Sequence, residues 1–244
     1  IFPPPEKADA EGCLGWTPTL NVPMLIDAYT HGIFPWPVRE REILWFTPPE
    51  RGVLYLDRLH IPARLARSLR RKRFRLKISE RFPDVIDHCS RVPRKGQEGT
   101  WITGKIRHAY RAFHDAGYVH SFEACNPDGE LVGGMYGISL GRVFCGESMF
   151  HLETDASKFA LLSAIATLRK CGVVMLDTQV MTPLLERFGA VEIPRVRFLE
   201  ELDRYLGDPI PAETLRANLL RAISHDLRTP LTSISGNAGI LMAV

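Results

Sequence analysis

The sequence lacks the long apolar run that a membrane-spanning helix requires. Its longest charge-free apolar stretches, such as residues 159–168, fall well short of the roughly 20 residues that cross a bilayer. The N-terminal stretch Ile1-Phe-Pro-Pro-Pro-Glu-Lys7 also lacks the apolar centre of a secretion signal. We therefore expect a cytoplasmic protein that has no membrane partner.

Cysteine is scarce, and its spacing argues against the usual structural roles of the residue. The chain has five scattered cysteines and no Cys-x-x-Cys pair. A zinc site is therefore not expected, and disulfides are not expected in a reducing cytoplasm. Because free Cys is among the most buried residue types, we expect buried thiols. The five residues are Cys13, Cys89, Cys125, Cys145 and Cys171.

Acidic residues are nearly absent from residues 64–81, where nine Arg or Lys side chains accompany a single acid, Glu80. The segment has a net charge of +8 against +3 for the whole chain, so the remainder carries −5. Such a concentration suits a phosphate backbone, although a solvated charged helix is an equal alternative on composition alone. The prevalence of arginine favours phosphate, which the guanidinium binds with two parallel hydrogen bonds. The candidate nucleic-acid-binding residues are Arg64, Arg67, Arg70, Arg71, Lys72, Arg73 and Arg75.

Prolines and aromatic residues crowd the first 60 residues, as in Phe34-Pro-Trp-Pro37 and Trp45-Phe-Thr-Pro-Pro49. Because proline fixes φ and removes a hydrogen-bond donor, we expect these aromatic side chains on rigid loops rather than on regular elements. A basic helix over residues 61–71 and a strand over residues 74–79 follow.

The pattern after residue 99 is clearer, because glycines and turn residues separate apolar segments of distinct periodicity. Three strands in succession precede a long helix, a buried strand, a short helix, a strand and a final helix. The expected elements are a helix at 105–117, strands at 119–125, 131–139 and 142–145, a helix at 155–170, a strand at 173–176, a helix at 183–189, a strand at 191–193 and a helix at 198–206.

These elements indicate an α+β fold with one mixed sheet, in the order found in acetyltransferase-like proteins. We divide the chain into a small N-terminal domain with the basic patch (1–80), an acetyltransferase-like catalytic domain (81–206), a linker (207–212) and a C-terminal helical tail (213–244). Acetyltransferases usually bind acyl-CoA through a glycine-rich turn that opens the long helix. Residues 150–158 occupy that place and contain no glycine, so acyl-CoA is not the expected ligand.

Polar residues follow two apolar strands of the predicted catalytic domain. Asp177 and Gln179 end one strand, and side chains two positions apart share one face of a strand. Ligands gather at such strand ends, where a carboxylate beside an amide can orient it and hold an amine. A satisfied polar pair is the alternative, and the local sequence does not decide between them. Glu147 follows the strand and glycine of Phe144-Cys-Gly146. An acid in this position is often a site residue, but taken alone the pattern is only a weak indication of one.

Six spaced motifs and two shorter matches, taken together, indicate a single protein family for these segments. The motifs are Ala28-Tyr-Thr-His-Gly-Ile-Phe-Pro-Trp36, Leu44-Trp-Phe-Thr-Pro48, Gly99-Thr-Trp-Ile-Thr103, Leu131-Val-Gly-Gly-Met-Tyr-Gly137, Phe144-Cys-Gly-Glu-Ser-Met-Phe150 and Leu176-Asp-Thr-Gln179. The shorter matches are Gly189-Ala190 and Ile193-Pro-Arg195. In this order the motifs are specific, and residues 2–206 resemble the leucyl/phenylalanyl-tRNA–protein transferases.

The resemblance implies an aminoacyltransferase that moves Leu or Phe, with Met as a further candidate, from a charged tRNA. The acceptor is the N-terminal Arg or Lys of a protein, which is thereby marked for degradation. Aminolysis of an activated ester runs downhill, so we expect neither a cofactor nor a metal. The attacking α-amine must be neutral, and its ordinary pKa is about 7.7–8.0. Holding two substrates in line is then the main catalytic resource.

The resemblance also implies catalytic roles for three residues. Gln179 positions the attacking amine through its carbonyl oxygen, because an amide is too weak a base to hold a proton. Asp177 orients Gln179, and Glu147 completes the polar network or receives the proton. By the same resemblance, the ligand expected for the basic patch is tRNA.

Substrate-binding residues are implied as well. A hydrophobic pocket takes the Leu or Phe side chain, and adaptable methionines suit both shapes. Its expected wall residues are Met135, Phe144 and Met149. An aromatic platform holds the terminal adenosine, although core packing is the alternative for each ring. Its expected members are Trp36, Trp101 and Tyr110. Tyr29 and Ser148, which lie inside two of the motifs, complete the expected set.

Residues 213–244 resemble a different family, the sensor histidine kinases, in their phosphoacceptor helix. The core of this match is His225-Asp-Leu-Arg-Thr-Pro230, with His225 as the expected phosphoacceptor. An apolar stripe recurs every four residues and requires a partner surface, on the body or on a second chain. We expect pairing between chains, hence dimerisation. The stripe is Leu215, Leu219, Ile223 and Leu227.

Two other hypotheses remain beside the aminoacyl transferase. One is a peptidoglycan cross-bridge transferase, which also uses charged tRNA but has a different acceptor; the six motifs argue against it. The other is a fusion or fragment with a phosphorelay signalling and dimerisation role through His225. The kinase's ATP-binding domain is missing from this sequence, so we do not expect the chain to phosphorylate itself.

Overall fold

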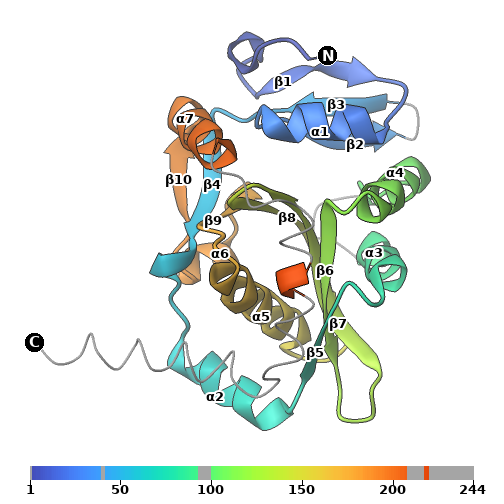
Figure 1. Ribbon diagram of the computed structural model, residues 1–244, viewed down its shortest axis with the longest axis vertical. Coiled ribbons are helices and arrows are strands. Elements are labelled where there is room, and N and C mark those ends of the chain that lie inside the picture. Colours follow the sequence, from blue (N-terminus) through green and yellow to red (C-terminus); the bar gives the residue numbers. More distant parts are fainter. Residues whose placement is uncertain (1, 40–41, 93–99, 208–216, 220–244) are drawn as a thin grey trace, which may run out of the picture.

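The computed structural model of the chain describes residues 2–39, 42–92, 100–207 and 217–219. Two sheets organise these residues: a three-stranded sheet near the N-terminus and a seven-stranded sheet below it (Figure 1). The α+β fold with a mixed sheet that the sequence predicts is thereby confirmed.

The three-stranded sheet is antiparallel and has the order β1-β3-β2. Helix α1 (Val22–Thr30) packs beside β2 and buries Tyr29. The side chain of Asn21 caps this helix by accepting a hydrogen bond from the backbone N of Met24 at 2.9 Å. The strands are β1 (Cys13–Thr17), β2 (Phe34–Arg39) and β3 (Glu42–Phe46).

The seven-stranded sheet has the order β10-β4-β9-β8-β7-β6-β5. Neighbouring strands are antiparallel except β8 and β9, which run parallel because helix α5 (Ala156–Lys170) connects them as a crossover. The strands are β4 (Glu50–Tyr55), β5 (Arg75–Ile78), β6 (Val119–Cys125), β7 (Leu131–Leu140), β8 (Val143–His151), β9 (Met175–Gln179) and β10 (Val191–Pro194).

Helices cover both faces of the seven-stranded sheet. Helix α5 packs on one face against β6 and β7, and α3 (Phe82–Arg91) packs on the other against β7 and β8 (Figure 1). The core is split accordingly, since adjacent residues of β7, Met135 and Tyr136, belong to different clusters. The remaining helices are α2 (Ala63–Lys72), α4 (Gly104–Asp115), α6 (Pro183–Arg187), α7 (Arg195–Leu206) and the 3-10 helices η1 (Pro5–Lys7) and η2 (Leu56–Arg58).

The prediction that the aromatic side chains of the first 60 residues lie on rigid loops rather than on regular elements is wrong. Phe34-Pro-Trp-Pro37 lies on β2, and Trp45 and Phe46 lie on β3. Strand β2 is at the edge of its sheet, where a proline can be accommodated because one side of the backbone has no partner strand. Proline therefore does not exclude a strand at this position, because the strand is at the edge of its sheet.

The predicted elements after residue 99 are present, but β8 is longer than expected. It continues from Cys145 to His151, so Glu147 and its neighbours lie on a strand rather than in a loop. The seven-stranded sheet also includes strands from before residue 80, where we placed the boundary between the two domains. Strands β4 and β5, which we assigned to the N-terminal domain, pair with β9 and β6 of the seven-stranded sheet.

Most of the C-terminal tail, including His225, lies outside the described residues. Residues 217–219 are helical, and Leu219 is 1 % exposed within the core cluster that contains α5. This member of the apolar stripe is therefore buried on the body of its own chain, whereas we expected it to pair between chains. No helix in the described part of the chain is long and apolar enough to cross a membrane.

Candidate functional site

A cavity of about 470 Å³ collects residues from β2, β7, β8, β9 and α5. Its wall is mainly apolar, with a few polar side chains. Seven of the residues expected from the sequence line it, although they come from segments far apart in the chain. They are Trp36, Trp101, Met135, Glu147, Ser148, Met149 and Gln179.

Glu147 is placed in this wall by an irregularity in the pairing of β7 and β8. Gly137 of β7 pairs with Gly146, and the preceding residue, Tyr136, pairs with Ser148. Glu147 is thus an extra residue on β8, as in a β-bulge. Such bulges often turn a side chain toward a functional site.

Gln179 ends β9 with a backbone conformation that L-amino acids rarely adopt. Gly52 of β4 pairs with Gln179 and Val53 pairs with Asp177, so Thr178 is an extra residue on β9. The φ of Gln179 is +64°, in the left-handed region. A Cβ on Gly52 would lie 2.6 Å from Thr178 Oγ1, which explains why a glycine faces the irregularity. The pairing of β4 with β9 therefore determines where the amide of Gln179 lies.

The carboxylate of Glu147 is surrounded by hydrogen-bond donors. Tyr29 Oη donates to Oε1 at 2.8 Å, and Tyr110 Oη donates to Oε2 at 3.1 Å. Gln179 Nε2 donates to Oε1 at 2.7 Å. The hydroxyls of Tyr29 and Tyr110 also lie 2.6 Å apart. Glu147 therefore joins the amide in the cavity wall to two buried tyrosines.

The number of available protons favours a neutral Glu147 in this arrangement. When Glu147 is ionised, the two tyrosine protons must serve three oxygen–oxygen contacts. A proton on Glu147 gives each contact a proton of its own. Burial raises the pKa of Glu147 to about 7, against the opposing effect of its hydrogen bonds. Burial, followed by the charge of Glu147, raises the pKa of both tyrosines well above their usual range, so they remain donors.

Asp177 lies behind the cavity wall, in an ion pair with Arg51. Arg51 Nε donates to Oδ1 at 2.8 Å and Arg51 Nη2 donates to Oδ2 at 2.6 Å, and both side chains are buried. The Arg51 guanidinium also lies over the rings of Phe34 and Phe198, 4.8 and 4.4 Å from their centroids. We did not predict Arg51. Its only local signal is a basic residue that follows Glu50 and precedes the apolar part of the strand.

The expectation that Asp177 orients the side chain of Gln179 needs correction. Asp177 Oδ1 accepts a hydrogen bond from the backbone N of Gln179 at 2.9 Å, whereas the Gln179 amide contacts Glu147. Asp177 thus holds the backbone at the strand end, and Glu147 holds the amide. The extra residue Thr178 and the positive φ break the alternation by which residues two apart share a face.

Two tryptophans form a stacked pair in the cavity wall. The rings of Trp36 and Trp101 have centroids 6.0 Å apart and an interplanar angle of 13°. Trp36 comes from β2, and Trp101 comes from the turn before α4. Both rings line the cavity, so they are placed to contact a flat ligand group.

Three residues expected to contact substrate are buried away from the cavity. Tyr110, expected in the aromatic platform, is on the inward face of α4, and Tyr29 is on the inward face of α1; both contact Glu147 instead. Phe144, expected in the pocket wall, is fully buried and packs edge-on against Phe122 with centroids 5.9 Å apart. These residues support the wall from behind, because the strand and helix faces that carry them point into the core.

The basic patch, which extends from α2 through the following turn to the first residue of β5, is exposed. Leu69 packs into the core while the seven basic residues face solvent, and none of them forms an ion pair with a residue that the structure describes. Positive charge at a helix C-terminus also has a structural benefit, since it offsets the helix dipole. The seven are Arg64, Arg67, Arg70, Arg71, Lys72, Arg73 and Arg75.

The site has the features of an enzyme pocket for group transfer. An apolar cavity of this size can hold a small-molecule group. A stacked indole pair suits a planar group, and Glu147 can exchange a proton near neutral pH. Among the described residues, no group of three or more His, Cys, Asp or Glu side chains could hold a metal ion.

Comparison with known proteins narrows this class to one family. Residues 53–203 match the Leucyl/phenylalanyl-tRNA protein transferase family, and residues 19–49 match the N-terminal domain of that transferase. The leucyl/phenylalanyl-tRNA--protein transferase of Myxococcus xanthus is 45% identical over 209 residues, covering 86% of this chain and 89% of the relative. That of Anaeromyxobacter sp. (strain K) is 47% identical, covering 85% of this chain and 89% of the relative. The chain belongs to the leucyl/phenylalanyl-tRNA–protein transferase family.

Two further similarities concern the fold and the tail. L-PGS from Bacillus licheniformis, a solved structure, has a TM-score of 0.43 and 11% identity, covering 72% of this chain and 66% of that one. Residues 215–243 match the His Kinase A (phospho-acceptor) domain family. The two transferase matches divide between residues 49 and 53, where the seven-stranded sheet begins, and not at residue 80.

Proposed function

We propose that the chain transfers Leu or Phe, with Met as a further donor, from charged tRNA to the α-amine of an N-terminal Arg or Lys. The acceptor protein is thereby marked for degradation in the cytoplasm, where charged tRNA is available. The observation that carries the proposal is the hydrogen bond between Gln179 and Glu147 at the wall of an apolar cavity, in a chain of this family.

The donor's amino acid side chain occupies the apolar part of the cavity. Met135 and Met149 are in its wall, and flexible thioethers can adapt to both a branched and an aromatic side chain. Gly146 keeps this part open, because a Cβ there would lie 3.3 Å from Leu176 Cδ1. The terminal adenosine then stacks on the indole pair at Trp36, as unstacked bases commonly do on aromatic side chains.

The chemistry is aminolysis of an ester. The amine nitrogen attacks the carbonyl carbon, a C–N bond forms, and the C–O bond to the ribose breaks. The proton that leaves the nitrogen must finally reach the ribose oxygen. The pKa of Glu147, about 7, leaves both its neutral and its ionised form populated near neutral pH; the ionised form accepts this proton and returns it to the ribose oxygen. Gln179 donates its Nε2 to Glu147, which leaves its carbonyl oxygen to position the amine.

The two remaining groups act by holding these residues in place. Asp177, paired with Arg51, fixes the backbone of Gln179, and Tyr29 and Tyr110 hold the carboxyl of Glu147. Most of the rate then comes from the alignment of two bound substrates, which is the largest resource available to a bimolecular reaction.

A transfer assay tests the proposal. The protein is incubated with labelled Leu-, Phe- or Val-tRNA and a peptide that begins with Arg, without ATP or CoA. We expect label in the peptide from Leu and Phe and not from Val. The matched control is the same peptide with an acetylated N-terminus, which has no free α-amine and should remain unlabelled. Dependence on CoA, or equal transfer of Val, would contradict the proposal.

A further inference from the structure

A second cavity, of about 520 Å³, lies at the opposite end of the parallel strands from the candidate site. Arg142 in its wall precedes β8, and Glu147 of the first cavity is five residues further along the chain, about 17 Å at the rise of a strand. Residues of η2, the end of α5 and α7 complete the wall. The cavity has five arginines, which are Arg58, Arg142, Arg169, Arg197 and Arg204.

The positive charge of this arginine cavity exceeds its negative charge. Its acids are Asp57 and Glu201, so the net charge of the lining residues is +3. Glu201 is already engaged, because it accepts hydrogen bonds from Tyr55 Oη at 2.7 Å and from Arg197 Nε at 2.9 Å. Three arginines are exposed and form no ion pair with a residue that the structure describes: Arg58, Arg169 and Arg204.

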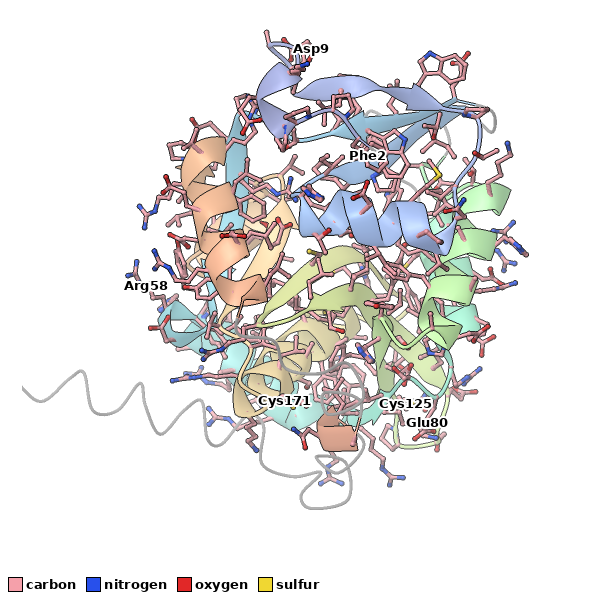
Figure 2. The ribbon with its side chains drawn as sticks, turned by 45° about the horizontal axis from the view of Figure 1, so that its top comes forward. Phe2, Asp9, Arg58, Glu80, Cys125 and Cys171 are labelled. Carbon is pink, nitrogen blue, oxygen red and sulfur yellow. The ribbon has the colours of Figure 1, made fainter. Side chains whose placement is uncertain are left out.

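These arginines continue the basic patch of α2. Arg58 ends η2, six residues before Arg64, the first basic residue of α2. In Figure 1, α7, the segment after β4 and α2 follow one another along one side of the molecule, and Figure 2 shows Arg58 at that outer edge. An extended polyanion that contacts α2 is therefore close to the arginine cavity as well.

We propose that the arginine cavity binds the sugar–phosphate backbone of RNA, as a second contact site for the tRNA beyond α2. A guanidinium fork matches a phosphate group with two parallel hydrogen bonds. Two basic surfaces in succession fit a long phosphate chain better than a single anion or a short acidic peptide. The inference rests on the proposed tRNA substrate, but RNA binding can be measured separately from transfer.

Salt-dependent binding of uncharged tRNA to the full chain tests this inference. The variant is Arg58→Gln/Arg169→Gln/Arg204→Gln, which removes three positive charges without breaking a described ion pair. Each lost phosphate contact is expected to lower the affinity for tRNA about fivefold at 0.1 M salt. It should also reduce the slope of log K against log salt by about 0.7–0.9. The variant should therefore bind about 100-fold more weakly, with a slope smaller by about 2–3.

A matched control removes the same charge from the other side of the molecule. The variant Arg91→Gln/Arg107→Gln/Arg111→Gln alters the end of α3 and the facing side of α4, outside the basic segment 64–81. It breaks only the surface ion pairs of Asp87, which contribute little to stability, and it should bind tRNA nearly as the unmodified chain does. Unchanged affinity and slope in the first variant would overturn the inference. Equal losses in both variants would also overturn it, because they would reflect only net charge.

Two further probes separate RNA from other anions. Poly-glutamate binding that falls in the first variant while tRNA binding is unchanged would assign the cavity to an acidic peptide and overturn the RNA proposal. Thermal stabilisation by inorganic phosphate that is lost while tRNA binding is unchanged would assign it to a free anion, with the same consequence. Loss of tRNA binding together with absent aminoacyl transfer in the unmodified chain would support this inference and contradict the proposed function.

Discussion

Arg51 holds Asp177 through two hydrogen bonds, of 2.8 and 2.6 Å, in the interior behind Gln179. The partners are 126 residues apart in the chain and come from neighbouring strands, β4 and β9. Breaking such a pair leaves a charge buried without compensation, which costs far more than the intact pair contributes. Asp177 is therefore a poor residue for testing the chemistry alone, since its loss affects folding first.

We predict that Asp177→Ala and Arg51→Ala each lower the free energy of unfolding by about 3–5 kcal/mol. The double variant Arg51→Met/Asp177→Leu, which replaces both charges with apolar groups, should recover most of this loss. Urea denaturation at one pH measures all three. An Asp177→Ala variant of normal stability and greatly reduced transfer would instead place Asp177 in the reaction itself.

The second prediction concerns Glu147 and the pH dependence of stability. Its pKa is raised from 4.5 to about 7 in the folded chain, so the folded state binds more protons than the unfolded state between these pH values. The contribution of Glu147 to the free energy of unfolding is therefore fully present below pH 4.5 and is lost as the pH rises through 7. Relative to Glu147→Gln, the unmodified chain should lose about 3 kcal/mol between pH 4.5 and pH 8.

Urea midpoints of the two proteins at pH 5 and pH 8 check this prediction. Glu186→Gln, on the exposed face of α6, is the matched control and should follow the unmodified chain at both pH values. A constant difference in stability between the unmodified chain and Glu147→Gln across this range would show that Glu147 ionises as an ordinary glutamate.

The third prediction concerns the amide in the cavity wall. Because Gln179 already has a φ of +64°, Gln179→Ala would keep the present backbone strain, whereas Gln179→Gly removes the side chain and relieves that strain, so that a loss of turnover cannot be attributed to a strained backbone. Turnover should fall about 100-fold or more, while the affinity for uncharged tRNA stays unchanged. Gln179→Asn, which also tolerates positive φ but has a shorter reach, should be nearly as slow. Near-normal turnover in both variants would remove the amide from the mechanism.

Sequence motifs could identify Glu147, Asp177 and Gln179 but not the contacts among them. Those contacts depend on two pairing irregularities, at Glu147 and at Thr178, that arise between strands distant in the chain. A strict alternation of side chains therefore gave the wrong relation between Asp177 and Gln179. Arg51 could not be predicted for the same reason, because its partner is defined by the register of β4 with β9.

The sequence also could not predict which of the aromatic side chains are buried in the core. Trp36 and Tyr110 were expected in the same aromatic platform, yet of these two only Trp36 lines the cavity. The difference is the orientation of β2 and α4 against the rest of the chain, which no local pattern encodes. By contrast, α2 was predictable, because two leucines four residues apart, Leu65 and Leu69, form an apolar stripe among exposed arginines and orient the helix.

The fourth prediction concerns the basic patch on α2. Replacing Arg67, Arg70 and Arg71 with Gln should weaken the binding of all tRNAs alike, because phosphate contacts carry no sequence information. Each lost contact should reduce the salt slope by about 0.7–0.9. Arg73 is left intact, because it lies after the last residue of α2 and the test is confined to the helix. Fluorescence anisotropy with two tRNAs of different sequence measures the effect; an unchanged slope would mean that the helix face is only solvated.

The last prediction concerns the choice between Leu and Phe. Gly146 lines the cavity, and its backbone conformation is open to alanine. In Gly146→Ala the added methyl group would lie 3.3 Å from Leu176 Cδ1 and 4.0 Å from Met135 Cε, so it takes space from the apolar part of the cavity. One methylene in a hydrophobic pocket typically changes discrimination by about 1–3 kcal/mol. Because Phe is larger than Leu, kcat/KM should fall about 10-fold or more further for Phe-tRNA than for Leu-tRNA.

Steady-state transfer to one Arg-initiated peptide, with each charged tRNA in turn, gives this ratio. Gly207→Ala is the control, because it adds the same methyl group after α7, outside the cavity lining, where a Cβ would lie 3.5 Å from Asp203 O; it should leave the ratio as in the unmodified chain. Equal losses for the two donors would mean that the cavity beside Gly146 holds another part of the substrate. A loss confined to Leu-tRNA would contradict the proposed pocket directly, since the smaller side chain cannot be the one excluded by a narrower cavity.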